Sequence, residues 1–182
     1  MGILFSEAGR NAEALCATKK AVELEPKDAQ AQYNLGNIFQ LVGKLDEAIV
    51  SYRQAVLLKP DYYQAHYNLG VKLEEKGELR EAEGSYRRAI KINPQLAVAH
   101  NNLGNVLAGL GQLKEASNSC TRATTINPNC PEAQSNVNLF LNYSLDCTRD
   151  FVYQNHLKFE KLFGSQVIRK SPKLPVKRRT RE

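Results

Sequence analysis

The chain has 182 residues, of which 42% are hydrophobic and 24% are charged. These proportions match ordinary globular domains and exclude fibrous, collagen-like and wholly disordered proteins. No stretch approaches the ~20 consecutive apolar residues that span a bilayer, so we expect no membrane partner. The formal net charge of +6 lies in residues 165–182, which hold seven Lys and Arg against one Glu. The rest of the chain is neutral, which argues against nucleic acid as its partner.

Cysteine usage and the first residues indicate a cellular compartment. The four cysteines form no C-x-x-C pair, so neither a zinc ribbon nor a dense disulfide framework is expected. The first residues lack the basic segment and the long apolar run of a secretory signal. We therefore expect an intracellular, cytoplasmic protein, with the nucleus as the alternative because the tail is basic.

Five columns of proline and small residues recur every 34 residues. The columns are Pro26, Pro60, Pro94 and Pro128; Gly2, Gly36, Gly70 and Gly104; Gly9, Gly43, Gly77 and Gly111; Ala14, Ala48, Ala82 and Ala116; and Ala21, Ala55, Ala89 and Ala123. So strict a period predicts a repeat protein in which each copy is one supersecondary unit.

Residues 29–62 show how one copy is expected to fold. Apolar residues at helical spacing occupy residues 33–42 and again residues 45–56. Gly43 separates the two segments, because glycine ends a helix without steric cost, and Pro60 stops the second helix. One copy is therefore a helix–turn–helix hairpin, and its small residues mark where the two helices approach closely.

In chain order the sequence predicts a solenoid of four repeats with two additions. The first copy lacks six residues and keeps Gly9 in the turn column, whereas Asn138 replaces the recurring glycine in the last hairpin. After Gly164 the composition shifts to Lys, Arg, Pro and Ser, which cannot form a packed core. The predicted units are a repeat array over 1–130 (1–28, 29–62, 63–96 and 97–130), a degenerate capping hairpin over 131–164 and a disordered basic tail over 165–182.

The pattern N-L-G, aromatic, A, Y, A and P over 34 residues resembles the tetratricopeptide repeat. The resemblance implies an all-α, right-handed superhelix whose first helices line a concave groove. It also implies a non-catalytic scaffold that binds extended or disordered protein segments. Repeats of this class that clamp acidic C-termini use Lys and Arg in the groove, and the corresponding slots here read Tyr33, Val98 and Asn102.

The sequence contains no enzyme motif, so no catalytic residue, cofactor or metal site is predicted. It has no phosphate-cradling glycine loop, no G-x-S-x-G elbow and no H-E-x-x-H helix. His66 and His100 share one repeat slot, but no Cys or Asp recurs beside them, which favours packed histidines over metal ligands. Cys120 occupies an aromatic core slot and is expected to be a buried, inert thiol.

Asparagine recurs in the first helix without a packing reason. It is a poor helix former, so repetition in one slot suggests selection for its amide, which donates and accepts hydrogen bonds. We expect an amide ladder that binds a peptide backbone; the alternative is that the amides join neighbouring repeats. Helix propensity predicts that alanine there would leave the melting temperature unchanged or higher. The candidate groove residues are Asn34, Asn37, Asn68, Asn102, Asn105, Asn136, Tyr33 and Tyr67.

The ladder, with its N-L-G-N runs at 34–37 and 102–105, resembles the superhelix of O-linked N-acetylglucosamine transferases. Residues 138–164 resemble the junction that joins repeats to the glycosyltransferase region in SPINDLY-like members. The resemblance implies a substrate- or partner-recruiting region whose UDP-GlcNAc-dependent enzyme would follow residue 182. Two alternatives remain: a free-standing adaptor, and a nuclear or nucleic-acid partner acting through the basic tail.

The helix expected at 149–163 carries more apolar residues than one stripe can hide. Exposed aromatic residues mark interfaces, so we expect a docking surface there. In the isolated chain its partner would be a second copy, and self-association is therefore predicted. The candidate residues are Phe151, Phe159 and Phe163.

Overall fold

The computed structural model describes the backbone of residues 2–142 and 149–170 and the side chains of residues 10–140 and 153–163. Within these residues the chain forms nine α-helices and no strand, which confirms the predicted all-α solenoid of helical hairpins. The helices are α1 (Gly2–Leu24), α2 (Ala29–Leu41), α3 (Leu45–Leu58), α4 (Tyr63–Lys76), α5 (Leu79–Ile92), α6 (Ala97–Gly109), α7 (Leu113–Ile126), α8 (Pro131–Asn142) and α9 (Arg149–Lys170).

The three central hairpins, α2–α3, α4–α5 and α6–α7, each turn at a glycine with positive φ. The φ angles are 73° at Gly43, 84° at Gly77 and 80° at Gly111, a conformation that costs other residues steric strain. In the first turn the Lys44 N–H donates to the Phe39 carbonyl oxygen at 2.8 Å and closes the end of α2. The glycine column thus sets the hairpin geometry.

A second glycine column lets the two helices of each hairpin touch. A Cβ atom added to Gly36 would lie 2.6 Å from the Tyr52 ring, and one added to Gly70 would lie 2.7 Å from the Tyr86 ring. Both tyrosines are fully buried. The missing side chain at Gly36 and Gly70 therefore leaves the space that the ring fills, and in the third hairpin the Cys120 side chain takes that space beside Gly104.

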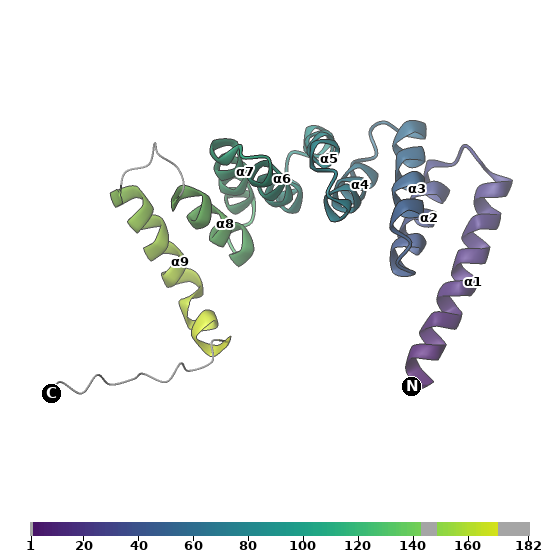
Figure 1. Cartoon of the computed structure of the whole chain (residues 1–182), viewed down its shortest axis with the longest axis horizontal. Coiled ribbons are helices and arrows are strands. Elements are labelled where there is room, and N and C mark those ends of the chain that lie inside the picture. The colour runs from purple at the N-terminus through teal and green to yellow at the C-terminus, as the bar shows by residue number, and fades with distance from the viewer. Residues whose placement is uncertain (1, 143–148, 171–182) are drawn as a thin grey trace.

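The hairpins stack into an arch (Figure 1). The first helices α4, α6 and α8 lie on the side of the arch that α1 and α9 flank, and the second helices α5 and α7 lie on the other side. We call these sides the inner face and the outer face. Between them runs one apolar core that joins residues of neighbouring hairpins, among them Leu73, Val106 and Leu107. Because each hairpin buries its apolar surface against the next, stacking supplies the core.

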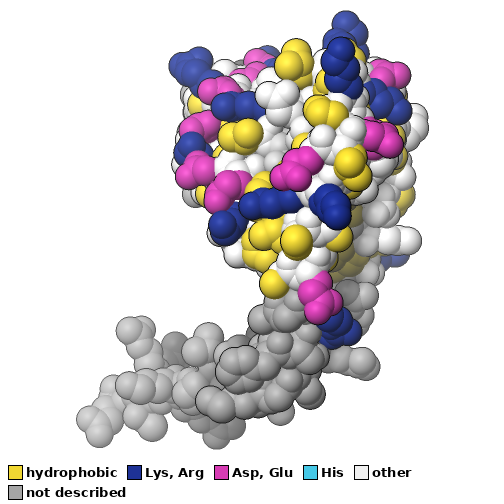
Figure 2. Space-filling view, turned by 90° about the vertical axis from the view of Figure 1, so that its right-hand side faces the viewer, with side chains coloured by type: hydrophobic (Ala, Val, Ile, Leu, Met, Phe, Trp, Pro, Cys, Tyr) yellow, Lys and Arg dark blue, Asp and Glu magenta, His cyan; other side chains and the backbone are white. Residues whose placement is uncertain are grey.

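Ion pairs also join neighbouring hairpins on the surface. The Arg53 guanidinium lies 2.7 Å from Glu81, and Arg87, one repeat later, lies 2.8 Å from Glu115. Solvent screens such exposed pairs, so each contributes at most about 1 kcal/mol. Seen from the α1 end of the arch, basic and acidic side chains are interspersed over the described surface (Figure 2).

The first repeat differs from its prediction. Residues 2–24 form one continuous helix, α1, and Gly9 lies inside it rather than at a turn. Continuing one helix through Gly9 satisfies the backbone hydrogen bonds of this segment, and a glycine inside a helix costs only about 1 kcal/mol. α1 packs on the array through Leu15 and Val22.

The last hairpin also departs from the repeat. Asn138 occupies the glycine slot, is 5% exposed, and its Oδ1 has no hydrogen-bond partner among the described residues. Gln154 stands in the slot of Tyr52 and Tyr86, and it is exposed. With neither a glycine on the first helix nor a buried side chain on the second in these slots, α9 contacts α8 but does not continue the row of second helices in Figure 1.

The predicted disordered tail begins too early. α9 continues through Gly164 to Lys170, so residues 165–170 are helical. A glycine inside a helix costs only about 1 kcal/mol, and the sequence has no proline before Pro172 to stop the helix. Residues 171–182 lie outside the described residues.

Candidate functional site

The candidate site lies on the inner face, where the predicted asparagine and tyrosine residues gather on successive first helices. The structure places Tyr33 and Asn37 on α2, Tyr67 and Asn68 on α4, and further asparagines on α6 and α8. Residues three or four apart on a helix share a face, so these side chains form a continuous polar row. The row crosses from one repeat to the next.

The first group joins α2, α3 and α4. The Tyr52 hydroxyl donates to Asn37 Oδ1 at 2.8 Å, and Asn68 Nδ2 donates to the same oxygen at 3.2 Å. Asn68 Nδ2 also lies 3.2 Å from the Tyr33 hydroxyl oxygen. The Tyr33 ring packs against Tyr62, with ring centroids 4.9 Å apart. Asn68 therefore connects its own repeat to the preceding one.

The second group repeats this arrangement 34 residues later. Asn102 Nδ2 donates to the hydroxyl oxygens of Tyr67 and Tyr86, both at 3.4 Å. The Tyr86 hydroxyl donates to Glu74 Oε2 at 2.7 Å. Burial raises the pKa of Tyr86, and the Glu74 carboxylate raises it further, so the phenol remains a protonated donor.

The third group replaces tyrosine with asparagine. Asn136 Nδ2 donates to Asn101 Oδ1 at 3.0 Å and to Asn105 Oδ1 at 2.9 Å. Asn101 stands in the repeat slot of Tyr33 and Tyr67. The same amide therefore makes the same inter-repeat bond although its acceptors have changed.

Only one end of each ladder amide is used in this way. Asn68, Asn102 and Asn136 donate through Nδ2, and their Oδ1 atoms accept no hydrogen bond from the described residues. Asn37 and Asn105 show the reverse, since their Oδ1 atoms accept and their Nδ2 atoms donate to no described residue. The inner face therefore offers both acceptors and donors.

Asn34, the first member of the ladder, makes a different bond. It is exposed, and its Oδ1 accepts from Gln30 Nε2 at 3.0 Å within α2. The other ladder amides donate through Nδ2 to the first helix of the preceding repeat. In the first repeat, residues 2–24 form the single helix α1 and no separate first helix. Asn34 is thus in the predicted row without the inter-repeat bond.

These contacts correct the expected effect of alanine in the ladder. Helix propensity alone predicts unchanged or higher stability, but Asn68, Asn102 and Asn136 each join two repeats. Their removal also leaves acceptors unpaired. Of the residues that receive these bonds, sequence reasoning missed Tyr86 and Asn101. The signal was present in the 34-residue spacing, which aligns Asn101 with Tyr33.

Known sequence families match the repeated part of the chain. Residues 41–77 and 72–111 match the family described as "TPR repeat", and residues 17–50 and 97–130 match families described as "Tetratricopeptide repeat". Together these matches extend from residue 17 to residue 130, more than half of the chain. The chain belongs to the tetratricopeptide repeat family. Members of this family act as protein-interaction scaffolds. No curated protein matches this sequence.

Solved structures share the fold of this tetratricopeptide array. MamA aligns with a TM-score of 0.80 at 23% identity, covering 92% of this chain and 97% of MamA. YrrB, described as a TPR protein with an unusual peptide-binding site, aligns with a TM-score of 0.76 at 24% identity, covering 91% and 84%. A mutant Thermobaculum terrenum O-GlcNAc transferase aligns with a TM-score of 0.62 at 26% identity, covering 73% of this chain and 26% of the transferase.

The inner face of the tetratricopeptide array holds few cations. Lys72 lies 2.6 Å from Glu75 and is therefore paired, and Glu74 is engaged by Tyr86. A clamp for acidic C-termini would need unpaired Lys or Arg here. The inner face instead presents amides and tyrosine rings, which suit the backbone and the apolar side chains of a bound segment.

His66, His100 and the buried Cys120 each have a local structural environment. His66 Nε2 lies 3.0 Å from the Pro60 carbonyl oxygen, and His100 Nε2 lies 3.1 Å from that of Pro94. Burial lowers the pKa of both histidines, and raises the pKa of the fully buried Cys120 thiol to about 12. Across the described side chains no three His, Cys, Asp or Glu residues gather where they could hold a metal ion.

The predicted docking residues on α9 are only partly at the surface. Phe163 is 5% exposed and Phe159 is half-buried. Their rings pack on one another, with ring centroids 5.3 Å apart. The side chain of Phe151 lies outside the described residues. The exposed apolar side chains are instead Tyr153, Leu157 and Leu162.

None of the helices in the described part of the chain has the length and apolarity to cross a bilayer.

Proposed function

We propose that this tetratricopeptide array is a non-catalytic scaffold that binds one extended protein segment along its inner face. The observation that carries the proposal is the orientation of the ladder amides. Asn68, Asn102 and Asn136 have Oδ1 atoms that accept no bond from described residues, one in each successive repeat. They suit the N–H groups of an extended backbone.

The amides of Asn37 and Asn105 complete the recognition. Their Nδ2 atoms donate to no described residue and suit the carbonyl groups of the same backbone. Contacts of this kind read the backbone and not the side chains, so we expect broad sequence tolerance. The rings of Tyr33 and Tyr67 are half-buried beside the row, where they give apolar side chains of the segment a surface.

A backbone substitution in the ligand tests this proposal. The probe is the tightest peptide selected from a random 12-residue library against the wild-type chain. Replacing one backbone amide by an ester removes a single N–H donor. We expect the esters that face the ladder to weaken binding roughly three- to tenfold, as for one lost hydrogen bond.

The decisive comparison uses variants of the chain. The Asn68→Ala and Asn102→Ala double variant should bind the amide peptide weakly and should no longer distinguish it from the ester. Asn118→Ala on α7 is the matched control, because it removes an exposed asparagine from the outer side. An ester effect that persists in the double variant would contradict binding through the ladder.

A finer proposal concerns the protein to which this array belongs. We propose that it recruits substrates or partners for an O-GlcNAc-transferase-like enzyme. The asparagine ladder, the segment 138–164 and the structural likeness to a transferase support this. The isolated chain should then fail to bind UDP-GlcNAc by calorimetry, and the parent gene should encode a glycosyltransferase after residue 182. A gene without that region would favour the free-standing adaptor.

We also propose that α9 supports self-association through Tyr153 and Leu157, which share one face of the helix and are 60% and 39% exposed. Sedimentation should show concentration-dependent dimers that Tyr153→Glu with Leu157→Glu abolishes. Gln154→Glu, on the same helix, is the matched control for added charge. A wild-type chain that stays monomeric at high concentration would contradict this proposal.

A role for the basic tail in binding nucleic acid would appear as salt-dependent DNA binding.

A further inference from the structure

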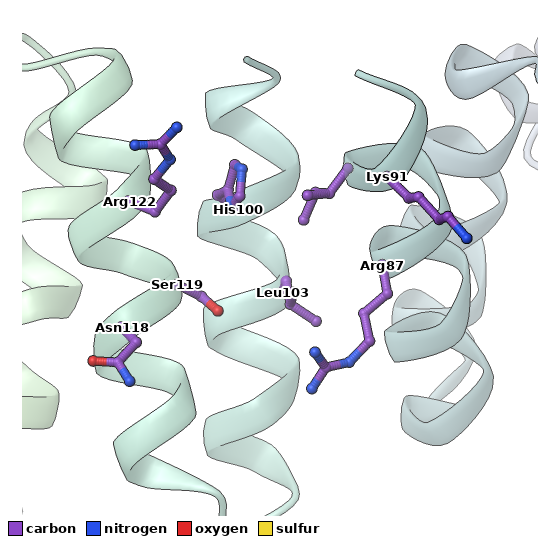
Figure 3. A pocket seen from close by; sticks show the side chains of 8 residues that line it. Arg87, Lys91, His100, Leu103, Asn118, Ser119 and Arg122 are labelled. Atoms are coloured by element: carbon purple, nitrogen blue, oxygen red, sulfur yellow. The ribbon is translucent and has the colours of Figure 1, made fainter. Parts of the chain in front are cut away.

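A cleft opens on the outer face, opposite the amide ladder. It has a volume of about 410 Å³ and lies between α5 and α7, with α6 beneath (Figure 3). Its lining residues come from these three helices: Arg87, Ile90, Lys91, His100, Leu103, Asn118, Ser119 and Arg122. The cleft arises because α5 and α7 belong to different hairpins and are separated by the width of α6.

The cleft combines an apolar floor with a basic rim. Leu103 is 4% exposed and Ile90 is half-buried, so together they offer a surface for one apolar side chain. Arg87, Lys91 and Arg122 surround this floor, and no acidic residue lines the cleft. Figure 3 shows Arg122 and His100 at one end of the cleft, with Lys91 on the α5 side and Asn118 at the other end.

The charges of the rim are not equally available. Arg87 is already paired, at 2.8 Å from both Glu83 and Glu115. Lys91 and Arg122 have no ion pair with any described residue and are exposed. The end of the cleft near His100 therefore carries positive charge that the described part of the chain does not neutralise.

The pKa of His100 depends on this positive charge. Its Nε2 lies 3.1 Å from the Pro94 carbonyl oxygen, so the ring is held at the end of the cleft. Burial lowers the pKa of His100, and the Arg122 guanidinium lowers it further. An anion seated beside Arg122 would offset that repulsion and would change the environment of the ring.

The preceding repeat contains part of the same arrangement. The repeat slots of Arg87, His100 and Arg122 hold Arg53, His66 and Arg88 there. Burial lowers the pKa of His66, and the nearby charge of Arg88 lowers it further. The slot of Lys91 is held by Leu57. Only the cleft between α5 and α7, among the described repeats, therefore has both unpaired cations beside the apolar floor.

We propose that the cleft between α5 and α7 binds a short acidic peptide segment. One apolar side chain of the segment rests on Ile90 and Leu103, an Asp or Glu carboxylate on one flank pairs with Arg122 on α7, and a second acidic residue on the other flank reaches Lys91 on α5. The charge complementarity of the rim selects an acidic partner, and the apolar floor selects a peptide over a simple anion. This site is separate from the inner face, and its success or failure does not depend on the ladder.

The test uses a labelled peptide with one central Leu between Asp and Glu residues, measured by fluorescence anisotropy. Matched peptides have Ser and Asn flanks, or a central Ala. We expect the acidic Leu peptide to bind the wild-type chain. Each matched peptide should bind with an affinity lower by at least about tenfold. The His100 ring resonances should shift during the titration.

Variants locate the binding. Arg122→Gln should weaken the acidic peptide roughly tenfold, as expected for a lost charge-assisted bond. Lys91→Leu, which copies the preceding repeat, should weaken it less. Both residues are exposed, so the variants should melt like the wild type. Asn68→Ala with Asn102→Ala should leave the affinity unchanged.

Three outcomes would overturn the proposal. The first is no binding of the acidic peptide at millimolar concentration. The second is binding that Arg122→Gln does not change. The third is equal binding of a 12-nucleotide single-stranded DNA with the same sensitivity to Arg122→Gln, which would make the cleft a general polyanion site.

Discussion

The central hairpins and the terminal segments of this array derive from one 34-residue period, yet they pack differently. In α2–α7 a glycine on the first helix faces a buried side chain on the second, as Gly70 faces Tyr86. In α8–α9 the same two slots hold Asn138 and Gln154, and Gln154 is exposed. The difference teaches that the repeat depends on matched pairs of slots and not on helix propensity alone.

The largest expected effect compares Tyr86 with Gln154, which occupy the same repeat slot. Tyr86→Ala removes a fully buried ring beside Gly70, and we expect it to lower the free energy of unfolding by about 3–5 kcal/mol. Gln154→Ala, on exposed surface, should change it by less than about 0.5 kcal/mol. Urea unfolding followed by circular dichroism measures both. Equal effects would contradict the difference between central and terminal hairpins.

The next comparison uses two glycines. Gly70→Ala places a Cβ atom 2.7 Å from the Tyr86 ring, and we expect it to cost about 1–3 kcal/mol through overpacking. A Cβ atom at Gly84, inside α5, meets nothing within 4 Å. Gly84→Ala should therefore stabilise the chain by about 0.5–1 kcal/mol. The same unfolding assay checks both, and a stabilising Gly70→Ala would show that the helices can move apart.

A smaller effect separates the ladder amides. Asn102→Ala removes the bonds to Tyr67 and Tyr86 and should cost about 0.5–1.5 kcal/mol. Asn34→Ala removes only a bond within α2, so its stability should hold or rise because alanine is the better helix former. Equal melting temperatures for the two variants would show that the inter-repeat bonds add nothing.

The smallest expected effect is a pH dependence within the central hairpins. Burial lowers the pKa of His66 and His100 below the ordinary 6.5. The unfolded chain therefore binds more protons than the folded chain as the pH falls below about 6.5, and stability decreases in that direction. The melting temperature should fall between pH 7.5 and pH 5.5, and it should fall less when both residues are replaced by Gln. An unchanged slope in that double variant would exclude the two histidines as the cause.

Most of the central architecture could be predicted from residue spacing. The turns at Gly43, Gly77 and Gly111 have positive φ where the glycine column predicted helix ends. Cys120, predicted to be buried, is fully buried. These features depend on local sterics and on a period that the chain repeats, so one copy is enough to explain the others.

The sequence by itself determined the period, the hairpins and the row of asparagines, because each follows from which residue types a helix or a turn accepts. Only the tertiary structure decided the contacts between repeats. Gly9 lies inside α1 because no separate first helix packs beside it, and Gly164 lies inside α9 in the same way. Asn102 uses its Nδ2 between repeats and leaves its Oδ1 available because the hydroxyls of Tyr67 and Tyr86 lie beside that nitrogen. These hydrogen bonds depend on which side-chain atoms of neighbouring repeats lie close together in space, and residue spacing along the sequence does not specify that.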